Sequence, residues 1–354
     1  MIKDLIPGMI TAENIYTVSG QLILPENLKL TDKMIMRLEF YSIDSINIVE
    51  EEDETEEEEE TPTLTYREKV AITPEFTHFR ESFFENMEYL QNSMNLVINR
   101  IAPIDTYSLL MNTLNIFSGN LTSIGVFDML HNMREYDDVT YHHSISVGIM
   151  CNIMGKWLGF SKEDIEVLTL AGLLHDVGKV MIPDSIMQKP ERLTLAEYEI
   201  IKTHPFQGYN LLKNEDIDER IKNAALMHHE RCDGSGYPSR LTANEIDEFA
   251  KIVAIADVYD AMSSARVYRG PLCPFDVIHI FETEGLRKYD PKYLLTFLER
   301  IVNTYMNNDV LLNNGETGTI IMINQLYLSK PVVKTTTGFI DLSQEPDLYI
   351  SKIL

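Results

Sequence analysis

The 354-residue sequence has few cysteines and no long hydrophobic run. Its three cysteines, Cys151, Cys232 and Cys273, are far apart and form no CxxC pair, so neither a disulfide framework nor a zinc knuckle is indicated. No segment stays apolar long enough to span a bilayer, and the N-terminus lacks the apolar stretch of a signal peptide. We therefore expect a cytoplasmic protein without a membrane span.

Positive charge is also scarce. The sequence has 30 lysines and arginines against 55 aspartates and glutamates, which gives a net charge of −25. The acidic tract at residues 50–60 carries ten of the negative charges, and the other residues still have a net charge of −15. This balance argues against general nucleic-acid binding through a basic face. An anionic substrate would need local positive charge from metals and a few arginines.

The pattern of hydrophobic residues divides the chain into four segments. Residues 1–49 alternate short apolar runs around one helix over residues 31–41, which indicates a small α+β module. Residues 50–64 are expected to be a linker, because a block of like charges repels itself and resists packing. Residues 65–308 have almost entirely helical periodicity, whereas residues 309–354 contain β-branched runs separated by Asn-Gly and Pro. The predicted fold is mainly α, with a small β element at the C-terminal end.

Histidines and aspartates recur along the helical segment, and their side chains are the ligands that hold two divalent metals side by side. They are His143, His175, Asp176, His204, His228, His229 and Asp257. Taken singly, each is explained about as well by a structural role. Several of them, however, stand where an apolar core residue is expected, and Asp257 on an apolar face would be costly without a partner. A metal centre accounts for the set better.

The neighbouring His142 points away from the helix face that carries His143. We interpret it as a surface residue.

Longer motifs surround these residues. HDVGK at 175–179, HPFQG at 204–208, HHERCDGSGYP at 228–238 and ADVYDAMSSARVYR at 256–269 resemble, in order, the motifs of the HD-GYP family of cyclic di-GMP phosphodiesterases. That family is a branch of the HD metal-dependent phosphohydrolases. The resemblance covers roughly residues 137–291. It implies an HD-domain helical bundle that carries a two-metal site.

The resemblance also implies a role for each matching position. The metal ligands of the family fall on the seven residues named above, with Asp176 bridging two divalent metals that are usually iron or manganese. Lys179 matches a lysine near the scissile phosphate. The substrate-binding positions match Tyr237, Gly236, Arg266 and Arg269. The implied reaction is hydrolysis of cyclic di-GMP to pGpG, GMP or both by a metal-bridging hydroxide, with Asp176 and Lys179 as catalytic residues.

Two alternatives to this function stay open. One is a catalytically silent receptor for cyclic di-GMP. Loss of a metal ligand would favour this alternative, but every matching metal ligand is present. The other is a phosphodiesterase acting on a hybrid cyclic dinucleotide, since no residue in the sequence visibly reads the guanine bases. The terminal modules have no cofactor motif. Three roles stay open for them: docking to the helical core, forming a homodimer and contacting a signalling partner.

The number of metals follows from one departure from the family. Some members have a glutamate one turn before the first histidine, which adds a ligand for a third metal, whereas this chain has Val139. We therefore predict two metals per chain. Metal analysis of anaerobically purified protein should find about two tightly bound ions, and about three would contradict the prediction.

Overall fold

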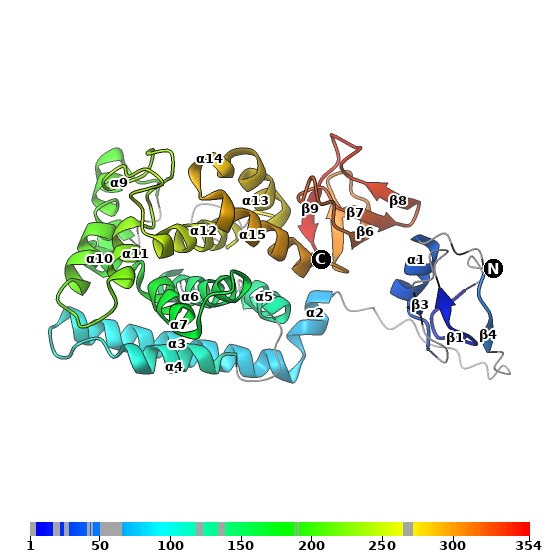
Figure 1. Ribbon diagram of the computed structural model, residues 1–354, viewed down its shortest axis with the longest axis horizontal. Coiled ribbons are helices and arrows are strands. Elements are labelled where there is room, and N and C mark those ends of the chain that lie inside the picture. Colours follow the sequence, from blue (N-terminus) through cyan, green and yellow to red (C-terminus); the bar gives the residue numbers. More distant parts are fainter. Residues whose placement is uncertain are drawn as a thin grey trace. The chain divides into compact units, whose positions relative to one another are not determined.

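The computed structural model describes residues 5–16, 22–24, 28–40, 43, 45–49, 66–117, 123–133, 139–187, 189, 191–264 and 272–354. The chain divides into two compact units, Met1–Thr63 and Leu64–Leu354. In Figure 1 the first unit is blue and the second runs from cyan to red. The linker predicted at residues 50–64 lies outside the described residues. The division into four segments stays a prediction.

The first unit combines one helix with short strands. Its elements are β1 (Ile10–Thr11), β2 (Ile15–Tyr16), β3 (Leu22–Leu24), α1 (Asp32–Phe40) and β4 (Ile48–Val49). Strand β1 pairs with β4 and β2 pairs with β3, both antiparallel. Leu24, Leu30 and Leu38 are buried in a small core of this unit. The predicted α+β module is confirmed.

The second unit begins with a helical bundle (Figure 1). Its helices and helical turns are α2 (Tyr66–Ala71), α3 (Pro74–Ile98), α4 (Thr106–Asn115), α5 (Ser123–Met133), α6 (Val139–Trp157), α7 (Lys162–Leu174), η2 (Val177–Met181), α8 (Asp184–Met187), α9 (Leu195–Ile201), α10 (His204–Leu212), α11 (Glu219–Met227), α12 (Glu248–Ser263), α13 (Pro274–Ile280), η3 (Phe281–Gly285), α14 (Leu286–Lys288), α15 (Pro291–Ile301) and η4 (Val302–Tyr305). Buried apolar residues from most of these helices, but not from α8, α9 or α14, share one large core. The mainly α fold is confirmed.

A five-stranded antiparallel sheet completes the second unit. Its strands are β5 (Asp309–Leu312), β6 (Thr317–Met322), β7 (Val332–Thr335), β8 (Gly338–Asp341) and β9 (Ile350–Ile353). They lie in the order β8-β7-β6-β5-β9. Val310, Ile320 and Val333 are fully buried and belong to the same core as the helices. The predicted C-terminal β element is confirmed, and it packs on the helical bundle.

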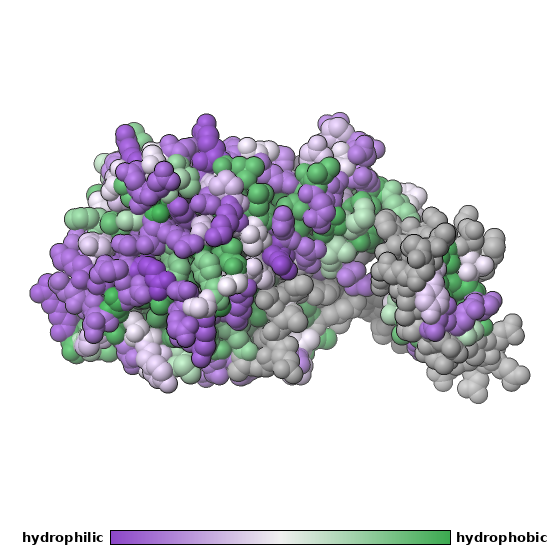
Figure 2. Space-filling model, in the orientation of Figure 1, coloured by the Kyte–Doolittle hydropathy of each residue, from purple (hydrophilic) through white to green (hydrophobic). Residues whose placement is uncertain are grey.

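The surface of the second unit mixes polar and apolar residues. Figure 2 shows hydrophilic residues over much of its helical end, with hydrophobic residues between them. Among the helices that the structure describes, none combines the length and the apolar character that crossing a bilayer requires.

The turn after α7 packs very closely on α10. A Cβ atom added to Gly178 would lie 2.0 Å from the backbone oxygen of His204 and 2.4 Å from the backbone nitrogen of Gly208. Only glycine permits such an approach between two backbones. The contact places η2, which follows Asp176, against the first turn of α10, which begins at His204.

The variant Gly178→Ala tests this contact. Its methyl group should force η2 and α10 apart, so we expect the free energy of unfolding to fall by at least about 1–3 kcal/mol. Thermal denaturation measures the effect. The control Gly315→Ala adds a methyl group that meets no atom within 4 Å, although φ at this residue is +87°. A melting temperature of Gly178→Ala equal to that of the wild type would contradict the prediction.

Candidate metal centre

The seven histidines and aspartates predicted as ligands come together in the helical bundle. They form two groups, each with ligand atoms within 4.8 Å of one another: Asp176, His204, His228 and His229, and His143, His175 and Asp257. All are buried except His229, which is partly exposed. The structure therefore gathers every residue of the predicted set.

Helix ends present most of these side chains. His175 follows the last residue of α7, Asp176 precedes η2 and His204 begins α10. His228 and His229 follow the last residue of α11. A side chain at a helix end can turn toward a shared cavity without lying beneath its own helix, so three separate segments of the chain can meet at one point. His143 and Asp257 instead lie within α6 and α12.

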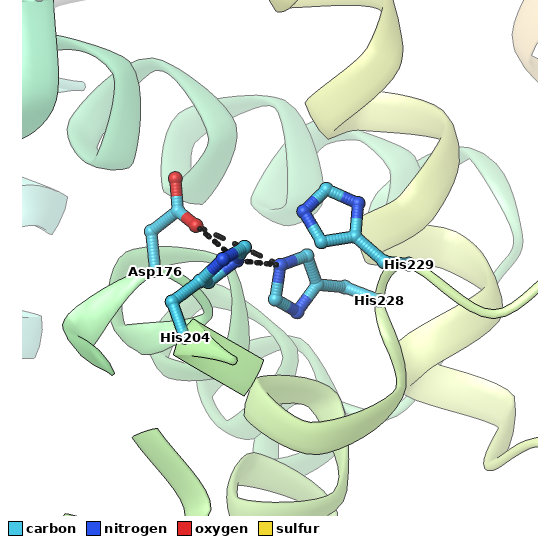
Figure 3. Close-up of side chains that lie close together, drawn as sticks. All are labelled: Asp176, His204, His228 and His229. Carbon is cyan, nitrogen blue, oxygen red and sulfur yellow. Dashed lines mark hydrogen bonds and ion pairs between the residues drawn. The ribbon is translucent and has the colours of Figure 1, made fainter. Parts of the chain in front are cut away.

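The carboxylate of Asp176 lies between the two groups. Its Oδ1 atom is 3.2 Å from Nε2 of His204 and 3.6 Å from Nε2 of His228. Dashed lines mark both contacts in Figure 3. Its Oδ2 atom is 3.3 Å from Nε2 of His175 and 3.6 Å from Nε2 of His143. One oxygen thus faces each group, which is the arrangement that a carboxylate shared by two metals requires.

Backbone carbonyls fix the orientation of three imidazole rings. The Nδ1 atom of His175 is 2.7 Å from the oxygen of Gly172, and that of His204 is 2.7 Å from the oxygen of Ile201. His228 Nδ1 lies 3.0 Å from the oxygen of Ala224. With the proton on Nδ1, each ring donates to a carbonyl and turns the Nε2 lone pair toward Asp176. Such bonds fix the tautomer of metal-binding histidines.

The polar atoms in the centre fit a cation. Among the residues described, His175 Nε2 and Asp176 Oδ1 are buried without a hydrogen-bond partner. Buried polar atoms normally have a partner, and each exception needs an explanation. Both atoms carry a lone pair, and the atoms that face them carry lone pairs too, so no hydrogen bond can form between them. A divalent metal would accept all of these lone pairs at once.

The charge states suit metal binding as well. Burial lowers the pKa of His228 to about 4. Burial and the adjacent His228 ring together hold the pKa of His229 well below its usual range. Burial alone would raise the pKa of Asp176, but the Lys179 ammonium and the His175 ring outweigh it and keep that pKa well below its usual value. Two imidazoles are therefore neutral at pH 7 while the carboxylate is ionised, which is the ligand form of each.

His143 lies between two carboxylates. Its Nε2 atom is 3.0 Å from Oδ1 of Asp257, and its Nδ1 atom is 2.7 Å from Oδ2 of Asp260. Burial opposes protonation of this ring, but both hydrogen bonds outweigh burial and raise the pKa of His143 to about 9. The surroundings of His143 therefore favour the positively charged form of its ring.

Sequence reasoning missed Asp260. It lies one turn after Asp257 on α12 and is buried. The spacing of three residues, which puts two carboxylates on one helix face, was the available signal. By accepting from His143 Nδ1, Asp260 orients the ring of that residue, as carboxylates behind metal-binding histidines commonly do.

Two residues predicted near the substrate adjoin the centre. The Nζ atom of Lys179 donates to Oδ2 of Asp176. The ring of Tyr237 stacks on His229 with 4.7 Å between the ring centres. Burial raises the pKa of Tyr237, so its hydroxyl is a neutral hydrogen-bond donor at pH 7.

The loop that carries Tyr237 is held against the end of α11. Gly236 packs so closely on this segment that an added Cβ atom would lie 2.5 Å from the Cα atom of Glu230. Sequence reasoning also missed Glu230, which is buried and accepts from the backbone N–H groups of Ser239 at 2.6 Å and Leu241 at 2.9 Å. These bonds fix the loop beside the metal centre.

The remaining predicted residues have different outcomes. Arg266 and Arg269 lie outside the described residues, and Val139 begins α6 but its side chain is not among those described. The prediction that His142 lies at the surface was wrong. It is buried, and its ring lies 4.8 Å from that of Phe83.

A helical bundle that gathers buried imidazoles and carboxylates around one aspartate defines a candidate divalent-metal centre. Residues 123–293 match the family model described as "HD domain", so this part of the chain is an HD domain. The family is metal-dependent, and the buried cluster provides the ligand types it needs.

Relatives of known activity confirm the resemblance to the HD-GYP family. The chain is 37% identical over 177 residues to a cyclic di-GMP phosphodiesterase of Thermotoga maritima, a match that covers 49% of this chain and 48% of that protein. It is 31% identical over 204 residues to a cyclic di-GMP phosphodiesterase of Pseudomonas aeruginosa, covering 57% and 49%. A 3′3′-cGAMP-specific phosphodiesterase of Vibrio cholerae is 39% identical over 145 residues, covering 41% and 34%. The chain thus spans about half the length of the first two relatives.

The role of Asp260 is testable with Asp260→Asn. We expect metal affinity to fall about 10–100-fold, because the amide is a weaker acceptor that holds His143 less firmly. Titration of the metal against a chelator measures this affinity. The control Glu248→Gln removes a charge at the partly exposed start of the same helix. Equal affinity in Asp260→Asn and wild type would show that Asp260 does not support the centre.

Proposed function

We propose that the chain is a metal-dependent phosphodiesterase that hydrolyses a 3′-5′ phosphodiester bond of a cyclic dinucleotide. Cyclic di-GMP is the first candidate, with pGpG, GMP or both as products. The observation that carries this proposal is the position of Asp176, whose two oxygens face two groups of ligands. The relatives named as cyclic di-GMP phosphodiesterases support the choice of substrate.

The seven gathered residues are proposed to hold two divalent metals, with Asp176 contributing to both. Mixed imidazole and carboxylate ligation suits iron or manganese. When bound, such ions polarise phosphoryl oxygens and lower the pKa of water from about 15.7 to about 7, which provides a nucleophile at neutral pH.

Residues of the chain itself position and neutralise the substrate. The Lys179 ammonium, which reaches Asp176, is proposed to face the scissile phosphate and offset negative charge on its oxygens. The leaving 3′ oxygen then takes a proton either from Lys179 or from a water molecule. Tyr237 offers a neutral hydroxyl beside His229. Arg266 and Arg269 are proposed to bind phosphate through their planar guanidinium groups.

A hybrid substrate is the second candidate. The 3′3′-cGAMP-specific relative of Vibrio cholerae is as similar over the matched residues as the cyclic di-GMP phosphodiesterases are. A silent receptor is disfavoured because all seven predicted ligands are present and gathered. We further propose a cytoplasmic enzyme, in agreement with its three free cysteines, whose terminal modules contact a second copy or a signalling partner.

The variant Asp176→Asn tests the mechanism at nearly constant side-chain volume. We expect it to lose tightly bound metal and to hydrolyse cyclic di-GMP at least on the order of a thousandfold more slowly, because the shared anionic ligand is gone. Turnover is measured with metal-loaded protein under anaerobic conditions, using cyclic di-GMP and 3′3′-cGAMP in parallel.

The control Asp184→Asn changes an exposed aspartate on the nearby α8 and should keep full activity. Undiminished hydrolysis by Asp176→Asn would refute the mechanism. A metal-loaded wild type that hydrolyses neither dinucleotide would refute the function.

A further inference from the structure

Helix α9 buries none of its residues. Leu195, Tyr198 and Ile200 are 86%, 48% and 40% exposed. Surface helices normally bury an apolar stripe against the core. Polar contacts hold the start of α9 instead, with a capping box between Thr194 and Glu197. The exposed ring of Tyr198 is therefore not explained by packing.

A line of contacts leads from α9 to the metal centre. Lys202 follows α9, and its Nζ atom lies 5.6 Å from the ring centre of Tyr198 and 5.7 Å from that of Tyr237. The ring of Tyr237 in turn stacks on His229. A cation within about 6 Å of an aromatic ring is attracted to its face. The Lys202 ammonium thus lies beside two aromatic rings, one exposed and one at the metal centre.

The charge of Lys202 is available to a ligand. Its ammonium pairs with Glu199 at 2.7 Å, where the Lys202 side chain is 27% exposed and that of Glu199 is 67% exposed. An ion pair whose carboxylate lies in solvent contributes little to stability, so a phosphate can replace the Glu199 carboxylate at small cost. Lys179, by comparison, is bonded to the buried carboxylate of Asp176. In a chain of net charge −25, an anionic ligand depends on such local cations.

We propose that Tyr198 and Lys202 bind the half of the dinucleotide that is not being cleaved. A base stacks on the exposed ring of Tyr198, and the Lys202 ammonium contacts the second phosphate. Aromatic rings bind any base in this way, because every base has a π face, and lysine binds phosphate as a point charge. This inference rests on the proposed function and extends it, since it explains how a substrate with two phosphates differs from a simple phosphodiester.

Two substrates separate this role from a structural one. Cyclic di-GMP has two bases and two phosphates, whereas bis(p-nitrophenyl) phosphate has one phosphate and no base. In metal-loaded full-length protein, Lys202→Gln and Tyr198→Leu should each raise KM for cyclic di-GMP about tenfold, with little change in kcat. Both should hydrolyse bis(p-nitrophenyl) phosphate like wild type. Lys202→Arg should retain most of the affinity.

The matched control is Lys213→Gln, which removes the same charge at the other end of α10, where Nζ of Lys213 contacts Asn210. Its KM for cyclic di-GMP should equal that of wild type.

The outcomes are distinct. An unchanged KM for cyclic di-GMP in Lys202→Gln and Tyr198→Leu, with active wild type, would overturn this proposal and leave the proposed function intact. Equal losses on both substrates would also overturn it, because they would show that Lys202 and Tyr198 only support the fold. A wild type that hydrolyses neither substrate would refute the proposed function itself, and this inference with it.

Discussion

The buried carboxylate of Asp176 is the group on which the rest of the centre depends. It lies in the interior, where an unpaired charge is strongly unfavourable. The structure surrounds it with Lys179 and with the Nε2 atoms of four histidines. These neighbours keep the pKa of Asp176 low despite burial. The neighbours that stabilise the ionised carboxylate are also the groups expected around a carboxylate that two metals share.

The bundle is built so that separate segments reach this point. Helix ends bring in His175, His204 and His228, and backbone carbonyls orient their rings. The close approach at Gly178 brings two of the contributing segments together without any side chain between them. Stability and function therefore rest on the same contacts, and a change in the packing of η2 on α10 should also affect the metal centre.

Much of the fold and the ligand set could be predicted from local patterns. Helical periodicity and the Asn-Gly and Pro signals located the bundle and the sheet, and residues such as Asp257 interrupted apolar stripes where a core residue was expected. The surface position predicted for His142 followed from one buried face on its helix, whereas residues 142–155 of α6 are all buried. Periodicity identifies which residues share a face but does not reveal how many faces are covered.

Other features depend on tertiary contacts that no local pattern encodes. In the sequence, Asp260 looks like any carboxylate on a helix. Only the packing of α6 on α12 brings His143 into contact with it. Glu230 acts across a loop, on the N–H groups of Ser239 and Leu241. The approach of Lys202 to Tyr237 joins residues 35 positions apart in the sequence.

The central claim is that Asp176 bridges two metals. It is tested most directly by the anomalous scattering of crystals grown anaerobically with manganese. We expect two metal peaks, each within bonding distance of a different oxygen of Asp176, one beside His204 and His228 and the other beside His143 and His175. A single peak, or two peaks that do not share Asp176, would contradict the account.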